Sequence, residues 1–219
     1  MMSDPFTIYI AGDMFDHKHV IGNATLADFI ERVSEGRYAC RVPQDFEMVK
    51  ARAVDVRNID LMEVMKCDLG IFNFDGPDVD SGTIVEFMFA KMLDIPSVIL
   101  RTDFRVAGDG DKEGWNLMAT NYPRTNNVKI HSLAWYREAR EQTDSLTELT
   151  DKLYTRIATD IIAALDDVRQ QPPVAKPGSI TPEIIYQWAL QFPASGFAER
   201  CGDGFVENVL VRKKAKGLI

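Results

Sequence analysis

The 219-residue chain is poor in the residues that build metal and disulfide sites. It has three cysteines, Cys40, Cys67 and Cys201, and no CxxC pair, so we expect no cysteine zinc site and a reducing compartment. It has three histidines, and His17 and His19 in "DHKH" lack the spacing of a helical HExxH site. These shortages predict a protein without a bound metal ion.

Glycine-rich phosphate loops are missing too. The segment "AGDMFDHKHVIG" (11–22) matches neither GxGxxG nor GxxxxGK, which argues against a dinucleotide or nucleoside triphosphate cradle. The acidic segment "GDGDKEG" (108–114) lacks the terminal glutamate spacing of an EF-hand loop. We therefore expect no cofactor.

Long apolar runs and clustered basic residues are also absent from the sequence. No stretch of 18 apolar residues occurs, so no membrane span is expected. The start, "MMSDPFTIYIAG", lacks a signal-peptide pattern, which predicts a cytoplasmic protein. A formal net charge of -8 and a pI of about 5.0 argue against a nucleic-acid polymer as the main partner.

What the sequence does contain is an alternation of apolar strands and amphipathic helices. Five strands separated by helices predict right-handed crossovers and a flavodoxin- or Rossmann-like, doubly wound α/β fold with a five-stranded parallel sheet. The expected strands are 7–12, 38–43, 69–74, 96–101 and 127–132. The expected helices are 23–36, 45–66 with Asp45 as cap, 81–94, 145–170, and 183–192 with Thr181 as cap.

The chain divides into two parts on this pattern. Residues 1–170 contain all five expected strands and form the predicted α/β domain. Residues 171–219 begin with the Pro-rich linker "QPPVAKPGS", continue with a capped helix and end in the basic segment "VRKKAKGLI". This second part is a helical extension to which the sequence assigns no role.

Acidic residues gather where a parallel sheet binds its ligands. Ligands lie beyond the carboxyl ends of the strands, which brings together "AGDMF" (11–15), "DGPDVDSG" (75–82) and "TDFR" (102–105). Glu86, near the start of the following helix, stays ionised there and is either a nucleophile or an acid that only satisfies the helix dipole. Taken alone, Asp80 is better explained as an ordinary helix cap.

Several segments together resemble the nucleoside 2-deoxyribosyltransferase family. They are "TIYIAGDMF", "CDLGIFNFDGPDVDSGTIVEFMFA", "PSVILRTDFR" and "WNLM", which occur in this order within residues 6–135. The most specific parts are D-x-G-T-x-x-E, formed by Asp80, Gly82, Thr83 and Glu86, and the N-L-M of Asn116 to Met118. Members of this family exchange the base on a 2'-deoxyribonucleoside, so the resemblance implies 2'-deoxyribonucleosides and free nucleobases as partners.

The resemblance also implies roles for individual residues. Glu86 would attack C1', Tyr9 would orient Glu86, and Asp68 would exchange a proton with the base. Taken alone, Asp68 is a common solvated acid beside a strand, whereas for the role that the resemblance implies we expect burial at the end of the apolar strand to raise its pKa. Asn116 would reach the 5'-hydroxyl of a sugar bound by a neighbouring subunit, in a homo-oligomer. The implied substrate-binding residues are Asp80, Gly82, Asn116, Met118, Gly12 and Phe15.

Other functions fit the same residues. An N-glycosidase would let water resolve the sugar–enzyme ester, and a non-catalytic nucleoside- or nucleotide-sensing module would use the crevice for binding alone. The acidic "AGDMFD" argues against a 5'-phosphate on the substrate by simple repulsion. The run Phe87, Met88 and Phe89 is more apolar than one buried helix face requires, which predicts burial against a second subunit.

Overall fold

The computed structural model describes residues 4–46, 52–105, 114–175, 178 and 180–219. Its centre is one five-stranded sheet in the order β2-β1-β3-β4-β5, in which every pairing is parallel. This confirms the predicted α/β fold. The strands are β1 (Phe6–Ala11), β2 (Tyr38–Arg41), β3 (Leu69–Asn73), β4 (Ser97–Arg101) and β5 (Thr125–Lys129).

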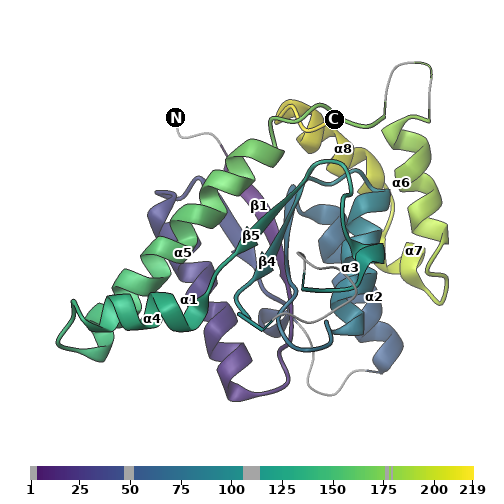
Figure 1. Cartoon of the computed structure of the whole chain (residues 1–219). Coiled ribbons are helices and arrows are strands. Elements are labelled where there is room, and N and C mark those ends of the chain that lie inside the picture. The colour runs from purple at the N-terminus through teal and green to yellow at the C-terminus, as the bar shows by residue number, and fades with distance from the viewer. Residues whose placement is uncertain (1–3, 47–51, 106–113, 176–177, 179) are drawn as a thin grey trace.

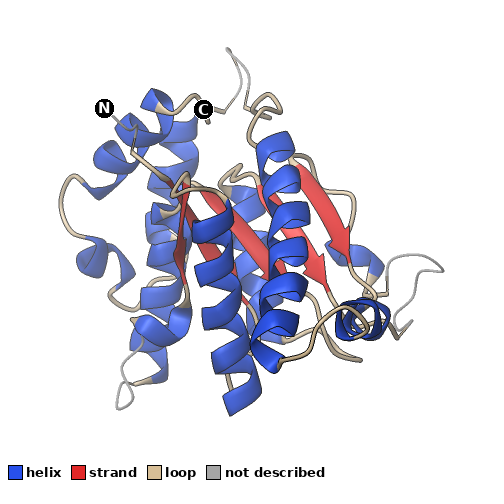
Figure 2. Ribbon diagram, turned by 90° about the vertical axis from the view of Figure 1, so that its left-hand side faces the viewer, coloured by secondary structure: helices blue, strands red, loops and turns tan. Residues whose placement is uncertain are grey.

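Helices cover both faces of the sheet (Figures 1 and 2). One hydrophobic cluster joins the sheet to α1 and α5, and a second joins it to α2, α3 and the C-terminal helices. None of the helices within the described ranges is long and apolar enough to cross a bilayer. The helices are α1 (His17–Val33), α2 (Ala53–Lys66), α3 (Ser81–Met92), α4 (Ser132–Arg140), α5 (Leu146–Val168), α6 (Pro182–Gln191), α7 (Phe197–Cys201) and α8 (Phe205–Ala215).

Two helix starts differ from the expected ones. The first helix begins at His17, earlier than predicted, because the Asp16 carboxylate accepts hydrogen bonds from two backbone amides of the first turn. Asp45 does not cap α2: it lies in a 3-10 turn, η1 (Pro43–Asp45), and α2 begins only at Ala53. Part of the predicted 45–66 helix, residues 47–51, and most of the "GDGDKEG" segment lie outside the described residues.

The C-terminal extension packs on the outside of α2 and α3 (Figure 1). Tyr186 of α6 and Phe197 of α7 are fully buried in the same cluster as Phe87. The rings of Phe89 and Phe197 meet edge to face with centroids 6.5 Å apart. The second apolar side of α3 is thus covered by the chain itself, which corrects the expectation that burying Phe89 requires a second subunit.

Candidate functional site

The centre of the candidate site is a hydrogen bond between β1 and α3. The Tyr9 hydroxyl donates to Glu86 Oε1 over 2.6 Å, although the two residues lie far apart in the sequence. Burial first, and then the charge of Glu86, hold the pKa of Tyr9 well above its ordinary value, so the hydroxyl keeps its proton and remains a donor. Glu86 itself is half-buried in the second turn of α3.

Two predicted substrate-binding residues shape the start of the helix that bears Glu86. Asp80 is the N-cap of α3, and its Oδ2 accepts from the Thr83 amide at 2.8 Å and from the Thr83 hydroxyl at 3.2 Å. A Cβ at Gly82 would lie 3.0 Å from Asp80 Oδ2. A side chain at position 82 would therefore press on the cap, which gives Gly82 a steric reason to be glycine.

The end of β1 comes close to the end of β3. A Cβ at Gly12 would lie 3.0 Å from the Cβ of Asn73, so this approach leaves no room for a larger residue. Phe15, three residues further on, exposes 79 % of its surface. The structure thus brings "AGDMF" and the loop after β3 to the same edge of the sheet, as predicted, and leaves Phe15 on the outside.

The carboxyl edge of the sheet concentrates negative charge. The pKa of Asp13 is raised, first by burial and then by the charges of Asp80 and Asp75, although His19 acts in the opposite direction. Asp75 ties the loop after β3 to the end of β4, because it accepts from the Thr102 amide and hydroxyl at 2.5 and 2.6 Å. Within the part of the chain that the structure describes, no group of three or more His, Cys, Asp or Glu side chains could hold a metal ion.

Asn116 and Met118 lie on a short turn beside this edge. Asn116 caps the 3-10 turn η2 (Leu117–Ala119), where its Oδ1 accepts from the Met118 amide at 2.9 Å. Buried Trp115 anchors the turn, because its ring packs edge to face on Phe74, with centroids 5.6 Å apart. Met118 is 72 % exposed. The reach of Asn116 into a neighbouring subunit stays a prediction.

Asp68 does not join the other predicted site residues. It precedes β3 and therefore lies at the amino edge of the sheet, where it accepts from Thr7 and, at 2.6 Å, from Lys216. Burial acts to raise its pKa, but Lys213, Lys216 and the Thr7 amide outweigh burial, so the pKa of Asp68 is lowered. The expectation of a raised pKa and a proton-transfer role in the crevice is corrected on both counts.

Asp60 is a site residue that no sequence motif indicates. This half-buried residue lies on α2, and its charge contributes to the raised pKa of Tyr9, after burial and Glu86. Its neighbours on α2, Leu61 and Val64, belong to the cluster that contains Tyr9. Asp60 therefore places a second carboxyl group near the Tyr9–Glu86 pair. The position in mid-helix gave no signal, since an acid there is usually a solvated surface residue.

Comparisons with known proteins bear on the family of this chain. The family model for nucleoside 2-deoxyribosyltransferase matches residues 8–118, about half of the chain, and this range includes Tyr9, Asp60 and Glu86. No curated protein sequence matches the chain.

Among solved structures, a conserved protein from Enterococcus faecalis V583 is 20 % identical over 76 % of this chain and 98 % of its own, with a TM-score of 0.46. A 2-desoxiribosyltransferase from Leishmania mexicana is 22 % identical over 61 % of this chain and 98 % of its own, with a TM-score of 0.45. A 2-deoxyribosyltransferase from Bacillus psychrosaccharolyticus is 16 % identical over 65 % of this chain and 95 % of its own, with a TM-score of 0.43.

Proposed function

This chain belongs to the nucleoside 2-deoxyribosyltransferase family, and we propose that it exchanges the nucleobase of 2'-deoxyribonucleosides through a covalent deoxyribosyl–Glu86 intermediate. The observation that carries the proposal is the 2.6 Å hydrogen bond from the Tyr9 hydroxyl to the Glu86 carboxylate. A carboxylate held at one oxygen has a restricted orientation, and orientation is what attack on C1' requires.

Glu86 and Asp60 divide the chemistry between them. In the first half-reaction a Glu86 oxygen bonds to C1' while the bond from C1' to the base nitrogen breaks. The electron pair of that bond goes to the base, which takes a proton from the Asp60 carboxyl group. In the second half-reaction a nitrogen of the incoming base attacks C1', its proton returns to Asp60, and the ester to Glu86 breaks.

The surrounding acids favour the charge that develops during this reaction. Breaking an N-glycosidic bond gives the sugar oxocarbenium character, and fixed negative charge near C1' stabilises it. Asp80 and Asp75 supply such charge beside Asp13, whose pKa is raised first by burial and further by these two carboxylates, against the opposing charge of His19. We assign the sugar hydroxyls to Asp80 and the 5'-hydroxyl to Asn116 of a neighbouring subunit.

A base-exchange assay tests the proposed function. Purified enzyme is incubated with 2'-deoxyinosine and adenine, and the products are separated by chromatography. New 2'-deoxyadenosine together with hypoxanthine is the expected result. Hypoxanthine and free deoxyribose without 2'-deoxyadenosine would contradict transfer and identify a hydrolase, and unchanged substrate would contradict both.

A further inference from the structure

Helix α2 (Ala53–Lys66) carries Asp60 near its middle, and other parts of the chain must fix its ends. The first amides and the last carbonyls of a helix have no partners within the helix. Among the described residues, no side chain caps the first turn of α2. Asp60 lies near the Tyr9–Glu86 pair, because its charge contributes to the raised pKa of Tyr9, after burial and the charge of Glu86. The position of α2 therefore decides where the Asp60 carboxyl group lies.

The first half of α2 is hydrogen-bonded to the segment between α6 and α7. Asn58 Nδ2 donates to the Ser195 carbonyl at 3.1 Å, and Arg57 Nη2 donates to the Pro193 carbonyl at 2.9 Å. Arg57 also donates to Asn58 Oδ1, at 2.7 and 3.1 Å, so the two side chains orient each other. Asn58 is only 1 % exposed. The contact is therefore directional and shielded from water.

The backbone of this segment has an unusual conformation. Ala194, Ser195 and Gly196 follow one another with φ of 51°, 52° and 81°, all in the left-handed region. This region is unfavourable for a residue with a Cβ, so the surrounding contacts must hold Ala194 and Ser195 in it. The turn presents the carbonyls of Pro193 and Ser195 to the donors on α2. The segment is thus shaped to accept hydrogen bonds from that helix.

The last turn of α2 is bound by α8. Arg212 donates to the Lys66 carbonyl, and buried Lys213 donates to the Cys67 carbonyl. These are carbonyls at the end of a helix, which basic side chains commonly satisfy. The C-terminal extension therefore contacts α2 on both sides of Asp60.

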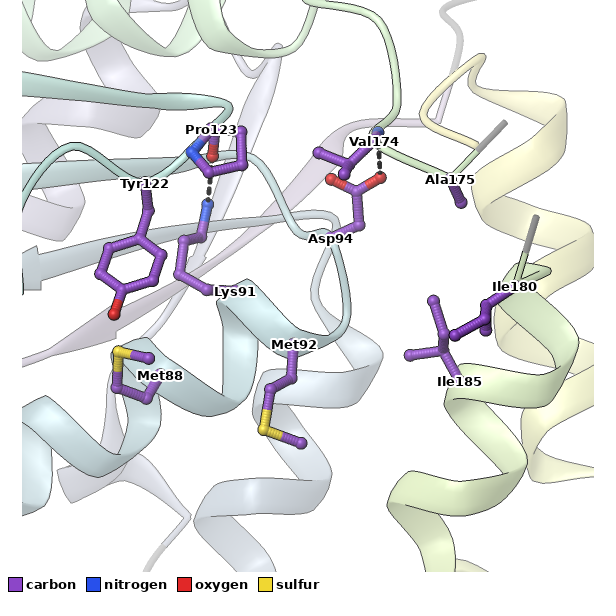
Figure 3. A pocket seen from close by; sticks show the side chains of 10 residues that line it. All are labelled: Met88, Lys91, Met92, Asp94, Tyr122, Pro123, Val174, Ala175, Ile180 and Ile185. Carbon is purple, nitrogen blue, oxygen red and sulfur yellow. Dashed lines mark hydrogen bonds between the residues drawn. The ribbon is translucent and has the colours of Figure 1, made fainter. Parts of the chain in front are cut away.

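The extension meets α3 in a different way near the start of α6. A pocket of about 420 Å³ lies between the two helices, and its walls include Met88 and Met92 from α3 and Ile180 and Ile185 (Figure 3). Contacts between such apolar side chains are non-directional. The hydrogen bonds to α2, which are directional, define the orientation in which the extension and α2 meet.

We propose that the C-terminal extension positions Asp60 for proton transfer by binding both ends of α2, with Asn58 and Arg57 as positioning residues. The inference rests on the proposed function, because it concerns the proton that the leaving base takes from Asp60. Asn58 and Arg57 act through the placement of the Asp60 carboxyl group and not through contact with the substrate. A displacement of about 1 Å at a reacting group can lower a rate on the order of a hundredfold.

Two nucleosides distinguish positioning of Asp60 from a general loss of structure. Adenine is a poor leaving group without a proton, whereas 6-chloropurine leaves more readily, because chlorine withdraws electrons and stabilises the base anion. The rate of base release in a single turnover without an acceptor base isolates the first half-reaction. Asn58→Ala and Arg57→Ala should lower this rate per folded molecule at least about tenfold with 2'-deoxyadenosine, and about threefold or less with 6-chloropurine 2'-deoxyriboside. Thermal unfolding gives the folded fraction.

Two further variants serve as controls for the positioning residues. Lys214→Ala removes an ion pair to Glu183, at 2.5 Å, that joins α8 to α6 within the extension, and it should leave both rates unchanged. Arg57→Lys keeps a donor at the end of the side chain and should recover part of the rate that Arg57→Ala loses. A structural role alone would lower the rates with the two nucleosides by the same factor.

Asp60→Asn separates failure of this inference from failure of the proposed function. It should show the same selective loss by a larger factor. If it does, while Asn58→Ala and Arg57→Ala lose nothing or lose equally with both nucleosides, positioning by the extension is overturned and the proposed function stands. If Asp60→Asn itself shows equal losses or none, the proton role of Asp60 is wrong and the inference falls with it. A wild type that releases neither base would contradict the proposed function as well.

Discussion

Carboxylates lie at both edges of the sheet, and the pKa of the carboxylate is shifted in opposite directions at the two edges. At the carboxyl edge, burial and the charges of Asp80 and Asp75 raise the pKa of Asp13. At the amino edge, Asp68 is even more deeply buried, yet its pKa is lowered because cations of α8 and the residues after it surround it. Lys216 bonds the carboxylate at 2.6 Å, and Arg212 pairs with it at 3.4 Å.

This difference distinguishes an acid that links two structural elements from an acid that we propose takes part in the reaction. An acid whose charge the chain neutralises holds two elements together, here β3 and the C-terminal extension. At the carboxyl edge the charges of Asp80 and Asp75 act on Asp13, and under the proposed function such negative charge would stabilise a positively charged transition state. Burial acts to raise the pKa of both acids. At Asp68 the lysine charges outweigh burial, whereas at Asp13 the opposing charge of His19 does not.

The largest effect on activity should come from removing the Glu86 carboxylate at the carboxyl edge of the sheet. Glu86→Gln keeps the size of the side chain but removes the nucleophile, so kcat for base exchange should fall at least about a thousandfold. The melting temperature should stay close to that of the wild type, because Glu86 is only half-buried. Initial rates by chromatography and calorimetric unfolding measure the two quantities. A variant with near-wild-type turnover would refute the covalent route.

Removing the acid of the amino edge should cost stability instead. Asp68→Asn leaves buried cations without their counter-charge, so the free energy of unfolding at pH 7 should fall by about 3 kcal/mol. The folded-state pKa lies below the ordinary value of 3.8, so the contribution of Asp68 is complete above that pH and is lost as the pH falls through the folded pKa. The difference between wild type and variant should therefore shrink in acid.

Denaturant unfolding between pH 3 and 8, together with the exchange rate per folded molecule, measures this second effect. The rate per folded molecule should remain within about threefold of the wild type, because Asp68 lies outside the site. A loss of stability there lowers the fraction of folded molecules and not the rate of each one. A large loss of kcat with unchanged stability would reverse the assignment of the two edges.

A smaller effect should follow from loosening Glu86 without removing it. Tyr9→Phe deletes only the hydroxyl that donates to Glu86, and one hydrogen bond to a charged group corresponds to roughly ten- to a hundredfold in rate. The loss should appear in kcat rather than KM, since Tyr9 positions the nucleophile. Steady-state kinetics on two nucleosides of different leaving group check this. An unchanged kcat would remove Tyr9 from the mechanism.

The centre of the sheet could be predicted because β1, β3 and β4 are apolar runs that end at a turn signal. The run "TIYIAG", which ends at Gly12, and the run "LGIFNF" indicate buried parallel strands from composition alone. The edge on which Asp68 lies was also available from the sequence: a residue before a strand faces the amino edge, away from the ligand. The role that the family resemblance implies for Asp68 conflicts with that topological rule.

Contacts between distant segments could not be predicted. Buried Lys213 lies in the basic "VRKKAKGLI" segment, which reads as a solvated end, and only the fold brings it to Asp68 and the Cys67 carbonyl. The edge-to-face contact between Phe89 and Phe197 likewise depends on how the C-terminal extension packs on α3. The hydrogen bond from Tyr9 to Glu86 was expected only through the resemblance, because no local pattern joins a strand residue to that helix.

The most direct test of the difference between the edges is the covalent intermediate itself. Wild type, Glu86→Gln and Asp68→Asn are each mixed with 2'-deoxyinosine without an acceptor base, quenched in acid, and their intact masses and peptides are measured. A deoxyribosyl adduct should appear on the α3 peptide of the wild type and of Asp68→Asn, and it should be absent from Glu86→Gln. An adduct on Asp68, or an adduct that persists in Glu86→Gln, would contradict the assignment of chemistry to the carboxyl edge.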